Sequence, residues 1–149
     1  MKEAQFVVST PSDFTSVIEV VLAAASAVTG TASVVTLSGD LGAGKTTFTQ
    51  QLAKHLGITE HVVSPTFGIM KSYELMDHPQ FDQLIHIDAY RIEDISEVGP
   101  LRFEELFKQP RTLICLEWPE KIESILPAEK VGVLIEIREG EERKVVFDF

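Results

Sequence analysis

Gly39-Asp40-Leu41-Gly42-Ala43-Gly44-Lys45-Thr46 is the stretch that decides the fold of this 149-residue chain. It satisfies the pattern G-x-x-x-x-G-K-[ST], in which the glycines open the backbone so that successive N–H groups point at phosphate oxygens. Lys45 adds a cation for the β- and γ-phosphates, and the Thr46 hydroxyl is suited to ligate Mg²⁺. The stretch therefore predicts a site for a nucleoside di- or triphosphate.

The residues on either side of this loop predict a strand before it and a helix after it. Residues 33–38 are apolar and β-branched, as a short buried strand should be. Residues 47–56 place apolar side chains at helical spacing and stop at Gly57. A helix that begins there directs its unpaired amides and its positive dipole end at the same anion.

Further strands and helices extend this unit into one α/β domain over residues 1–149. The pattern predicts strands at 6–9, 67–75, 83–88 and 112–116, and a C-terminal hairpin of 130–137 with 144–149. It predicts helices at 14–28, 92–107 and 120–125, the second of them with a break at Gly99-Pro100. Strands that alternate with helices indicate three layers, and the two hairpins add antiparallel edges. We therefore predict a single-domain P-loop NTPase fold with a mixed, mostly parallel central sheet.

The composition of the chain indicates which kind of partner it binds and in which cellular compartment it works. The net charge is −10, from 13 basic against 23 acidic residues, which disfavours direct nucleic-acid binding and favours docking on another protein. Cys115 is the single cysteine and lies in an apolar run, so we expect a buried thiol and no disulfide. The longest apolar stretch, residues 17–28, is too short to span a membrane, and no secretory leader opens the chain. A cytoplasmic protein is expected.

Two acidic residues stand where predicted strands end. In open α/β sheets, ligands bind outside the carboxyl ends of the strands. Glu117 follows a buried strand, and such an acid beside Thr46 would hold Mg²⁺ or orient the attacking water. Asp88 ends another strand, where alternation places His86, Asp88 and Tyr90 on one face. Three polar groups on one face suggest a polar network, with His86 as a hydrogen-bonded structural residue.

Other features distinguish between the kinds of P-loop protein. The chain contains no asparagine, so it lacks the Asn-Lys-x-Asp motif with which GTPases read guanine. An Arg-rich lid of the kind that clamps a second substrate in small kinases is also missing. The segment Ser64-Pro65-Thr66-Phe67 follows the predicted helix, where P-loop proteins often sense the γ-phosphate through a Thr hydroxyl. Trp118 follows Glu117 and is expected to pack beside the site. An ATPase is the reading that remains.

With these features in place, the chain resembles the bacterial TsaE family, the ATPase subunits of the tRNA threonylcarbamoyladenosine machinery. The resemblance rests on four motifs in order, Gly39–Thr47, Ser64–Phe67, His86–Arg91 and Glu117–Glu120. It implies a single-domain ATPase of weak intrinsic activity that uses ATP and Mg²⁺. The partners implied are the threonylcarbamoyl transferase and its dimerising partner protein, with tRNA reached only through the complex. The modified base would be the adenosine next to the anticodon.

The resemblance also assigns roles to particular residues. Thr46 and Glu117 would hold Mg²⁺, Asp88 would be the second acid essential to hydrolysis, and Lys45 would stabilise the transferring phosphoryl group. Thr66 would belong to a switch-like catalytic loop. The nucleotide would be bound by Leu41, Gly42, Ala43, Gly44, Lys45, Thr46 and Thr47, with Trp118 nearby and a hydroxyl from Thr10 or Thr15.

Two departures from the family pattern and two alternative functions remain at this point. Gly68 stands where a hydroxyl residue is common, and Arg102 stands where glycine is common. The first alternative is a nucleotide-dependent binding module, in which ATP occupancy changes a surface and hydrolysis is incidental. The second is a small-molecule kinase, which would transfer phosphate to an acceptor other than water.

Overall fold

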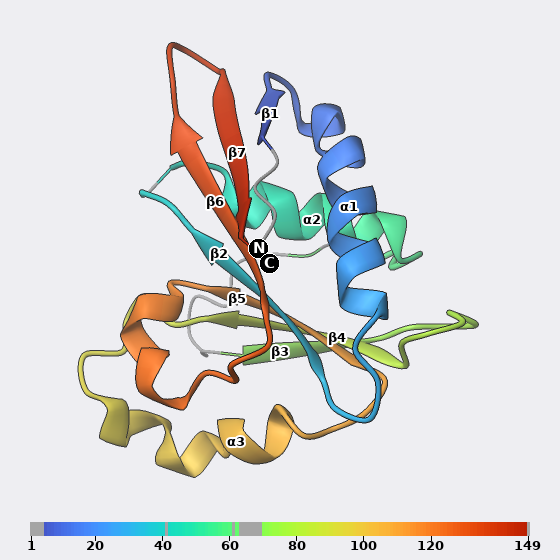
Figure 1. Cartoon of the computed structure of the whole chain (residues 1–149), viewed down its shortest axis with the longest axis vertical. Coiled ribbons are helices and arrows are strands. Elements are labelled where there is room, and N and C mark those ends of the chain that lie inside the picture. The colour runs from blue at the N-terminus through green and yellow to red at the C-terminus, as the bar shows by residue number, and fades with distance from the viewer. Residues whose placement is uncertain (1–4, 41, 61, 63–69, 149) are drawn as a thin grey trace.

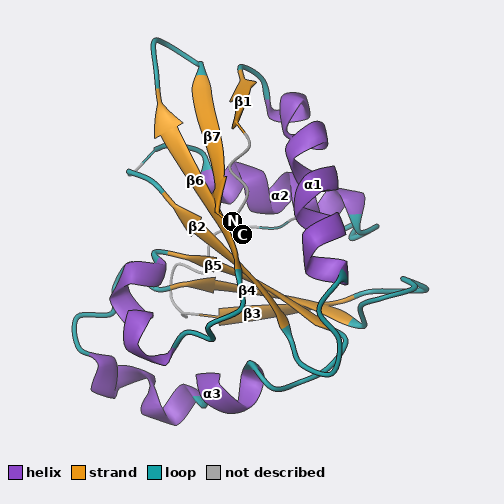
Figure 2. Ribbon diagram, in the orientation of Figure 1, coloured by secondary structure: helices purple, strands orange, loops and turns teal. Residues whose placement is uncertain are grey.

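The computed structural model describes residues 5–40, 42–60, 62 and 70–148. Among these residues, seven strands form one sheet in the order β1-β7-β6-β2-β5-β4-β3 (Figures 1 and 2). The strands are β1 (Gln5–Val8), β2 (Ser33–Ser38), β3 (Met70–Glu74), β4 (Gln83–Asp88), β5 (Thr112–Glu117), β6 (Val131–Ile137) and β7 (Arg143–Asp148). The predicted strand at 67–75 is described from Met70 onward.

The sheet is mixed, and its parallel part lies in the centre. Strands β6, β2, β5 and β4 pair in parallel, whereas β1 with β7, β7 with β6, and β3 with β4 pair antiparallel. Parallel strands are usually buried on both faces, and every residue of β5 is buried here. The predicted fold class, with antiparallel hairpins at the edges, is confirmed.

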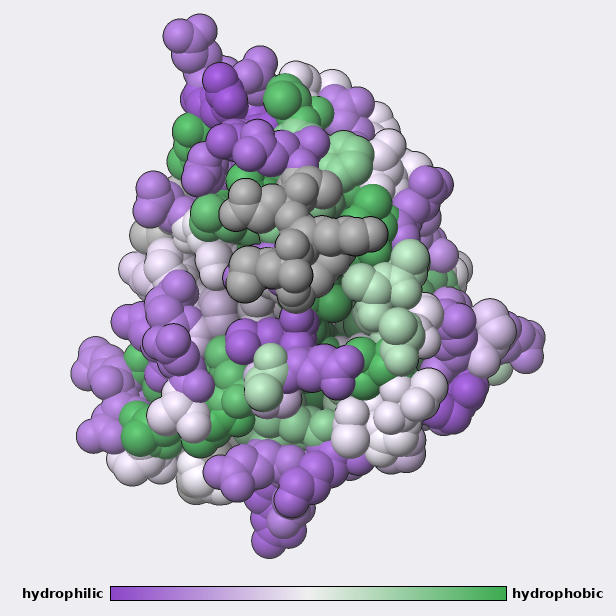
Figure 3. Space-filling view, in the orientation of Figure 1, coloured by the Kyte–Doolittle hydropathy of each residue, from purple (hydrophilic) through white to green (hydrophobic). Residues whose placement is uncertain are grey.

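Helices cover both faces of this sheet and give the three layers. On one face lie α1 (Phe14–Ser26) and α2 (Lys45–His55), preceded by the 3-10 turn η1 (Pro11–Asp13). On the other lie the 3-10 helices η2 (Ile95–Leu101) and η3 (Pro119–Ile125) with the short α3 (Phe103–Leu106). No helix in the described part of the chain is long and apolar enough to cross a membrane. Figure 3 shows hydrophilic residues around much of the rim of one face.

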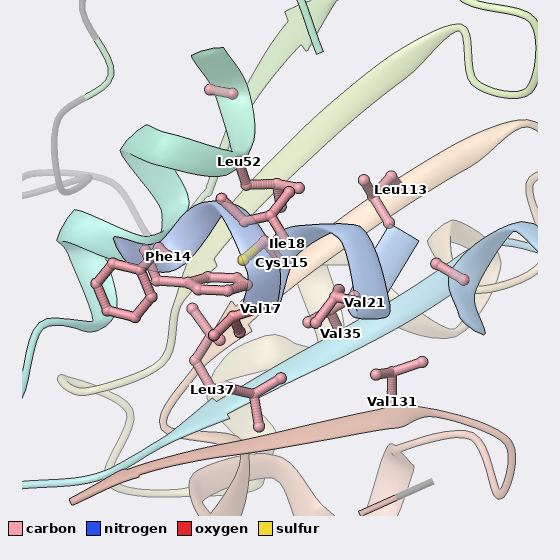
Figure 4. Packing of buried hydrophobic residues seen from close by; sticks show 14 of the residues in the cluster. Phe14, Val17, Ile18, Val21, Val35, Leu37, Leu52, Leu113, Cys115 and Val131 are labelled. Carbon is pink, nitrogen blue, oxygen red and sulfur yellow. The ribbon is translucent and has the colours of Figure 1, made fainter. Parts of the chain in front are cut away.

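The main hydrophobic core joins α1 and α2 to the sheet. Val17, Ile18 and Val21 project from α1, and Leu52 from α2, toward strand residues such as Val35 (Figure 4). These side chains are fully buried, which stabilises the fold by roughly 1.5–3 kcal/mol each. A second core on the opposite face fixes α3 and η3 beneath β4 and β5. The carboxyl ends of the central strands are thereby held between two rigid layers.

The region predicted as a helix over 92–107 is mostly a 3-10 helix, so that expectation was partly wrong. Asp94 caps η2 by accepting the Ser96 N–H at 3.0 Å, and the helix ends at Leu101. Arg102 then adopts φ 53° and ψ 46°, a left-handed conformation that glycine adopts more readily. This conformation gives a physical reason for the glycine that the resemblance leads one to expect at this position. The other departure, Gly68, lies outside the described residues.

Cys115 is fully buried in the main core, as expected, and its thiol should be inert in the folded chain. Burial raises the pKa of Cys115 from 9.0 to about 12, although the hydroxyl of Thr49 opposes the shift. We expect Ellman's reagent at pH 8 to react with the thiol only as fast as the chain unfolds, because the thiolate is the reactive form. Reaction rates measured across a urea titration test this.

The denatured chain, which should react at once, is the control for the Cys115 experiment. The folded chain keeps a proton that the unfolded chain releases above pH 9.0, so this group favours folding less as the pH rises from 9.0 toward about 12. Fast labelling of the native chain at pH 8 would contradict the burial of this thiol.

Candidate functional site

The phosphate-binding loop joins β2 to α2 and turns on three glycines with positive φ. Gly39 has φ 145°, Gly42 has φ 80° and Gly44 has φ 110°, so all three adopt conformations that other residues rarely take. Gly44 is the N-cap of α2, and its carbonyl accepts the Phe48 N–H at 2.9 Å. The helix thus begins at Lys45, two residues earlier than its periodicity predicts. Leu41, in the middle of the loop, lies outside the described residues.

Lys45 is held at the mouth of this loop. Its side chain is buried, and Nζ donates to the carbonyls of Gly39 at 2.5 Å and Asp40 at 2.9 Å. The ammonium also lies 4.2 Å from the centroid of the Trp118 ring, which gives a cation–π contact. Burial lowers the pKa of Lys45, while the nearby Glu117 carboxylate opposes that shift. A desolvated cation at this position is suited to bind phosphate oxygens.

Glu117 lies beside Thr46, as its place at the end of β5 predicts. The Thr46 hydroxyl is 3.4 Å from Glu117 Oε1 and 3.3 Å from Oε2. His86 Nε2 lies 2.6 Å from Glu117 Oε2 in a pair that is buried on both sides. The carboxylate therefore accepts from two side chains, one on α2 and one on β4. His86 is the hydrogen-bonded residue that the sequence predicts, and it orients the acid.

Asp88 reaches the same site from the neighbouring strand. The parallel register pairs Asp88 with Glu117, so the two carboxylates stand side by side at the carboxyl ends of β4 and β5. One Asp88 oxygen accepts the Tyr90 N–H at 3.0 Å. Tyr90 itself lies beyond the end of β4, is 44% exposed and packs its ring 5.1 Å from that of Trp118. Of the three polar residues predicted to share a face, His86 and Asp88 therefore lie on β4, whereas Tyr90 lies just beyond its end.

These elements enclose a cavity of about 310 Å³, large enough for a small ligand. The residues that line it are Gly42, Gly44, Lys45, Thr46, Thr47, Asp88, Tyr90, Glu117 and Trp118. Eight of these nine are residues that the sequence singles out for the site. Tyr90 is the addition, and its alternation with His86 and Asp88 is the signal that could have found it.

Several predicted site residues are not in the cavity wall. Ala43 is fully buried behind the loop. Thr10 is exposed and its hydroxyl lies 3.1 Å from that of Ser12, and Thr15 is half-buried on α1. A nucleotide contact from either threonine stays a prediction. Thr66 lies outside the described residues, so its catalytic role stays a prediction as well.

Comparison with known proteins gives a consistent match over most of the chain. The family model of the threonylcarbamoyl adenosine biosynthesis protein TsaE matches residues 13–145. The tRNA threonylcarbamoyladenosine biosynthesis protein TsaE of Bacillus subtilis is 46% identical over 115 residues, which cover 76% of this chain and 68% of that relative. The protein of the same name from Rickettsia typhi is 37% identical over 111 residues, covering 74% of this chain and 73% of the relative.

A solved structure agrees with these matches. The crystal structure of Bacillus subtilis YdiB superposes with a TM-score of 0.71 and 32% identity, covering 98% of this chain and 84% of the other. The family model, over residues 13–145, spans the phosphate loop, both strand-end acids and strands β2 to β6. This chain belongs to the TsaE family.

Proposed function

We propose that this chain is a Mg²⁺-dependent ATPase that supports threonylcarbamoylation of the adenosine next to the tRNA anticodon. The proposal rests on the observation that one cavity brings Lys45, Thr46, Asp88 and Glu117 together. The relatives named above are tRNA threonylcarbamoyladenosine biosynthesis proteins, which supports the process. We further propose that its partners are the threonylcarbamoyl transferase and its dimerising partner protein, and that the complex works in the cytoplasm.

The loop and the helix behind it bind the phosphates. The first amides of α2 have no partner within the helix, and its positive dipole end faces the cavity. Lys45 turns its ammonium from the loop carbonyls to the β- and γ-phosphate oxygens, where charge develops during hydrolysis. Trp118 lies over Lys45 and shields this contact from water, which strengthens the attraction between opposite charges.

The residues at the base of the cavity fit a magnesium ion. Mg²⁺ prefers oxygen ligands, and the Thr46 hydroxyl lies within 3.4 Å of both Glu117 oxygens. Among the described residues, no group of three or more His, Cys, Asp or Glu side chains is placed to hold a metal. Two protein oxygens fit a cation that is shared with the phosphates of a nucleotide. When bound, Mg²⁺ would neutralise charge on the β- and γ-phosphates.

The two carboxylates then take different roles. Glu117 is only 3% exposed and is engaged by His86 and Thr46, so it is the fixed acid beside the cation site. Asp88 is half-buried and faces the cavity one strand away. Asp88 is therefore the acid that orients the attacking water and accepts its proton.

A second function, a nucleotide-dependent binding module, is favoured by the aromatic pair at the cavity mouth. Tyr90 is 44% exposed and contacts Trp118, which in turn contacts Lys45. A phosphate that moves Lys45 would also move this exposed pair. In this alternative the nucleotide controls docking, and hydrolysis is incidental.

We expect the purified chain to hydrolyse ATP slowly with Mg²⁺, and faster once the transferase, its partner protein and tRNA are added. Release of inorganic phosphate, followed with and without the partners and with GTP in parallel, measures this. A non-hydrolysable ATP analogue should support no repeated rounds of tRNA modification. Equal modification with the analogue over many rounds would favour the binding module, and phosphate transferred to an organic acceptor would favour a kinase.

A further inference from the structure

The β6–β7 hairpin contacts the phosphate loop at two points, although none of its residues lines the cavity described above. Gly39 lies against β6 so closely that a Cβ there would be 2.4 Å from the Ile135 carbonyl oxygen. Arg143, the first residue of β7, donates from Nε to the Ala43 carbonyl at 3.1 Å. Figure 1 shows the hairpin beside β2, the strand that leads into the loop. Both ends of the loop thus rest on one hairpin.

Arg143 is itself rigidly held. Its backbone is paired with Val8 of β1 on one side and with Ile137 of β6 on the other. Its Nη1 donates to the Gly140 carbonyl at 2.8 Å and to the Glu142 carbonyl at 2.9 Å. The planar guanidinium is therefore fixed between the hairpin turn and the phosphate loop. Its contact with Ala43 is an anchor for the loop.

This anchor determines the direction of one amide in the loop. A trans peptide is planar, so the Ala43 carbonyl and the Gly44 N–H point in opposite directions. Because Arg143 holds the carbonyl, the Gly44 N–H points away from the hairpin, and Gly44 lines the cavity. Glycine has the freest backbone, so this peptide needs such a restraint.

We infer that Arg143 is a positioning residue that aims the Gly44 amide at the phosphates of a bound nucleotide, an inference that rests on the proposed function. Arg143 does not touch the ligand. It lowers the cost of ordering the loop before binding, which increases affinity without a new contact.

The test is the dissociation constant for ADP of Arg143→Ala, measured well below its melting transition. Trp118 is the only tryptophan of the chain, so its fluorescence reports on the site, and calorimetry gives an independent value. We expect the constant to rise about tenfold, as for the loss of one hydrogen bond from a charged donor. Arg143→Lys keeps the charge but not the planar fork, and should weaken binding by only about threefold.

Arg111→Ala is the matched control. Arg111 also holds a hairpin turn, through Asp82 at 3.0 Å, the Pro79 carbonyl at 3.2 Å and the His78 carbonyl at 3.4 Å. It precedes β5 and so lies at the end of the sheet opposite the cavity. We expect both alanine variants to lower the urea midpoint of unfolding, and only Arg143→Ala to lose ADP affinity.

Four outcomes would overturn the inference. Unchanged ADP affinity in Arg143→Ala, with binding by the wild-type chain, removes the positioning role and leaves the proposed function intact. An equal loss of affinity in Arg111→Ala shows that general destabilisation is the cause. Failure of the wild-type chain to bind ADP is a separate result that removes the proposed function and the inference with it. If Arg143→Ala does not fold, the Arg143→Lys variant decides the question. An ADP affinity of Arg143→Lys equal to that of the wild-type chain also overturns the inference.

Discussion

Replacing Glu117 with glutamine is expected to lower ATP hydrolysis by the assembled complex at least about 100-fold, a loss typical of removing one preorganised charge-stabilising group. Glutamine has nearly the same shape, so the fold should persist. Its amide carries no charge, however, and is a poorer ligand for Mg²⁺ than a carboxylate. It also changes the group that His86 contacts at 2.6 Å. Phosphate release under single-turnover conditions is the measurement.

Glu123→Gln is the matched control for this experiment. Glu123 follows Glu117 by six residues, is exposed and does not line the cavity, so hydrolysis should change little. Asp88→Asn separates the two acids, because it should lower hydrolysis without raising the Mg²⁺ concentration needed for half-maximal Trp118 fluorescence change. Glu117→Gln should raise that concentration. Wild-type turnover by Glu117→Gln would show that the acid at the end of β5 has no part in hydrolysis.

The sequence predicts the parts of this molecule that depend on local patterns. The glycine-rich loop and the apolar segments around it identify β2 and β4 at their observed bounds, Ser33–Ser38 and Gln83–Asp88. The sequence also singles out Asp88 and Glu117, because each is an acidic residue at the end of an apolar strand. A carboxylate next to a buried strand has few structural reasons to be there. These signals also place the site at the carboxyl ends of the strands, where the cavity is found.

Other features depend on contacts between distant segments and have no local signal. The contact of His86 with Glu117 follows from the parallel register that sets β4 beside β5. Arg143 reaches Ala43 across 100 positions of sequence, through a strand order that no periodicity reveals. The 3-10 helix η2 replaces the expected α-helix because the Asp94 cap and the left-handed Arg102 bound a short segment. Contacts between segments that are distant in the sequence therefore determine the first two of these features.

Gly39→Ala is expected to destabilise the chain by about 3 kcal/mol, the largest effect on stability that we predict for a single methyl group. A positive φ costs a non-glycine residue about 1–2 kcal/mol, and Gly39 has φ 145°. The added Cβ would also lie 2.4 Å from the Ile135 carbonyl oxygen, and overpacking of this kind costs about 1–3 kcal/mol. Urea unfolding followed by circular dichroism measures the loss.

Gly57→Ala distinguishes the two causes of this loss. Gly57 follows α2 with φ 85°, and nothing lies within 4 Å of a Cβ built there, so its substitution has the backbone cost alone, about 1 kcal/mol. Equal losses for the two variants would contradict the close contact between Gly39 and β6. Because β6 is paired with β2 up to Ser38–Leu134, the strands cannot separate at Gly39 without breaking that ladder. The first glycine of the loop is therefore required by its neighbouring strand as well as by its phosphate-binding turn.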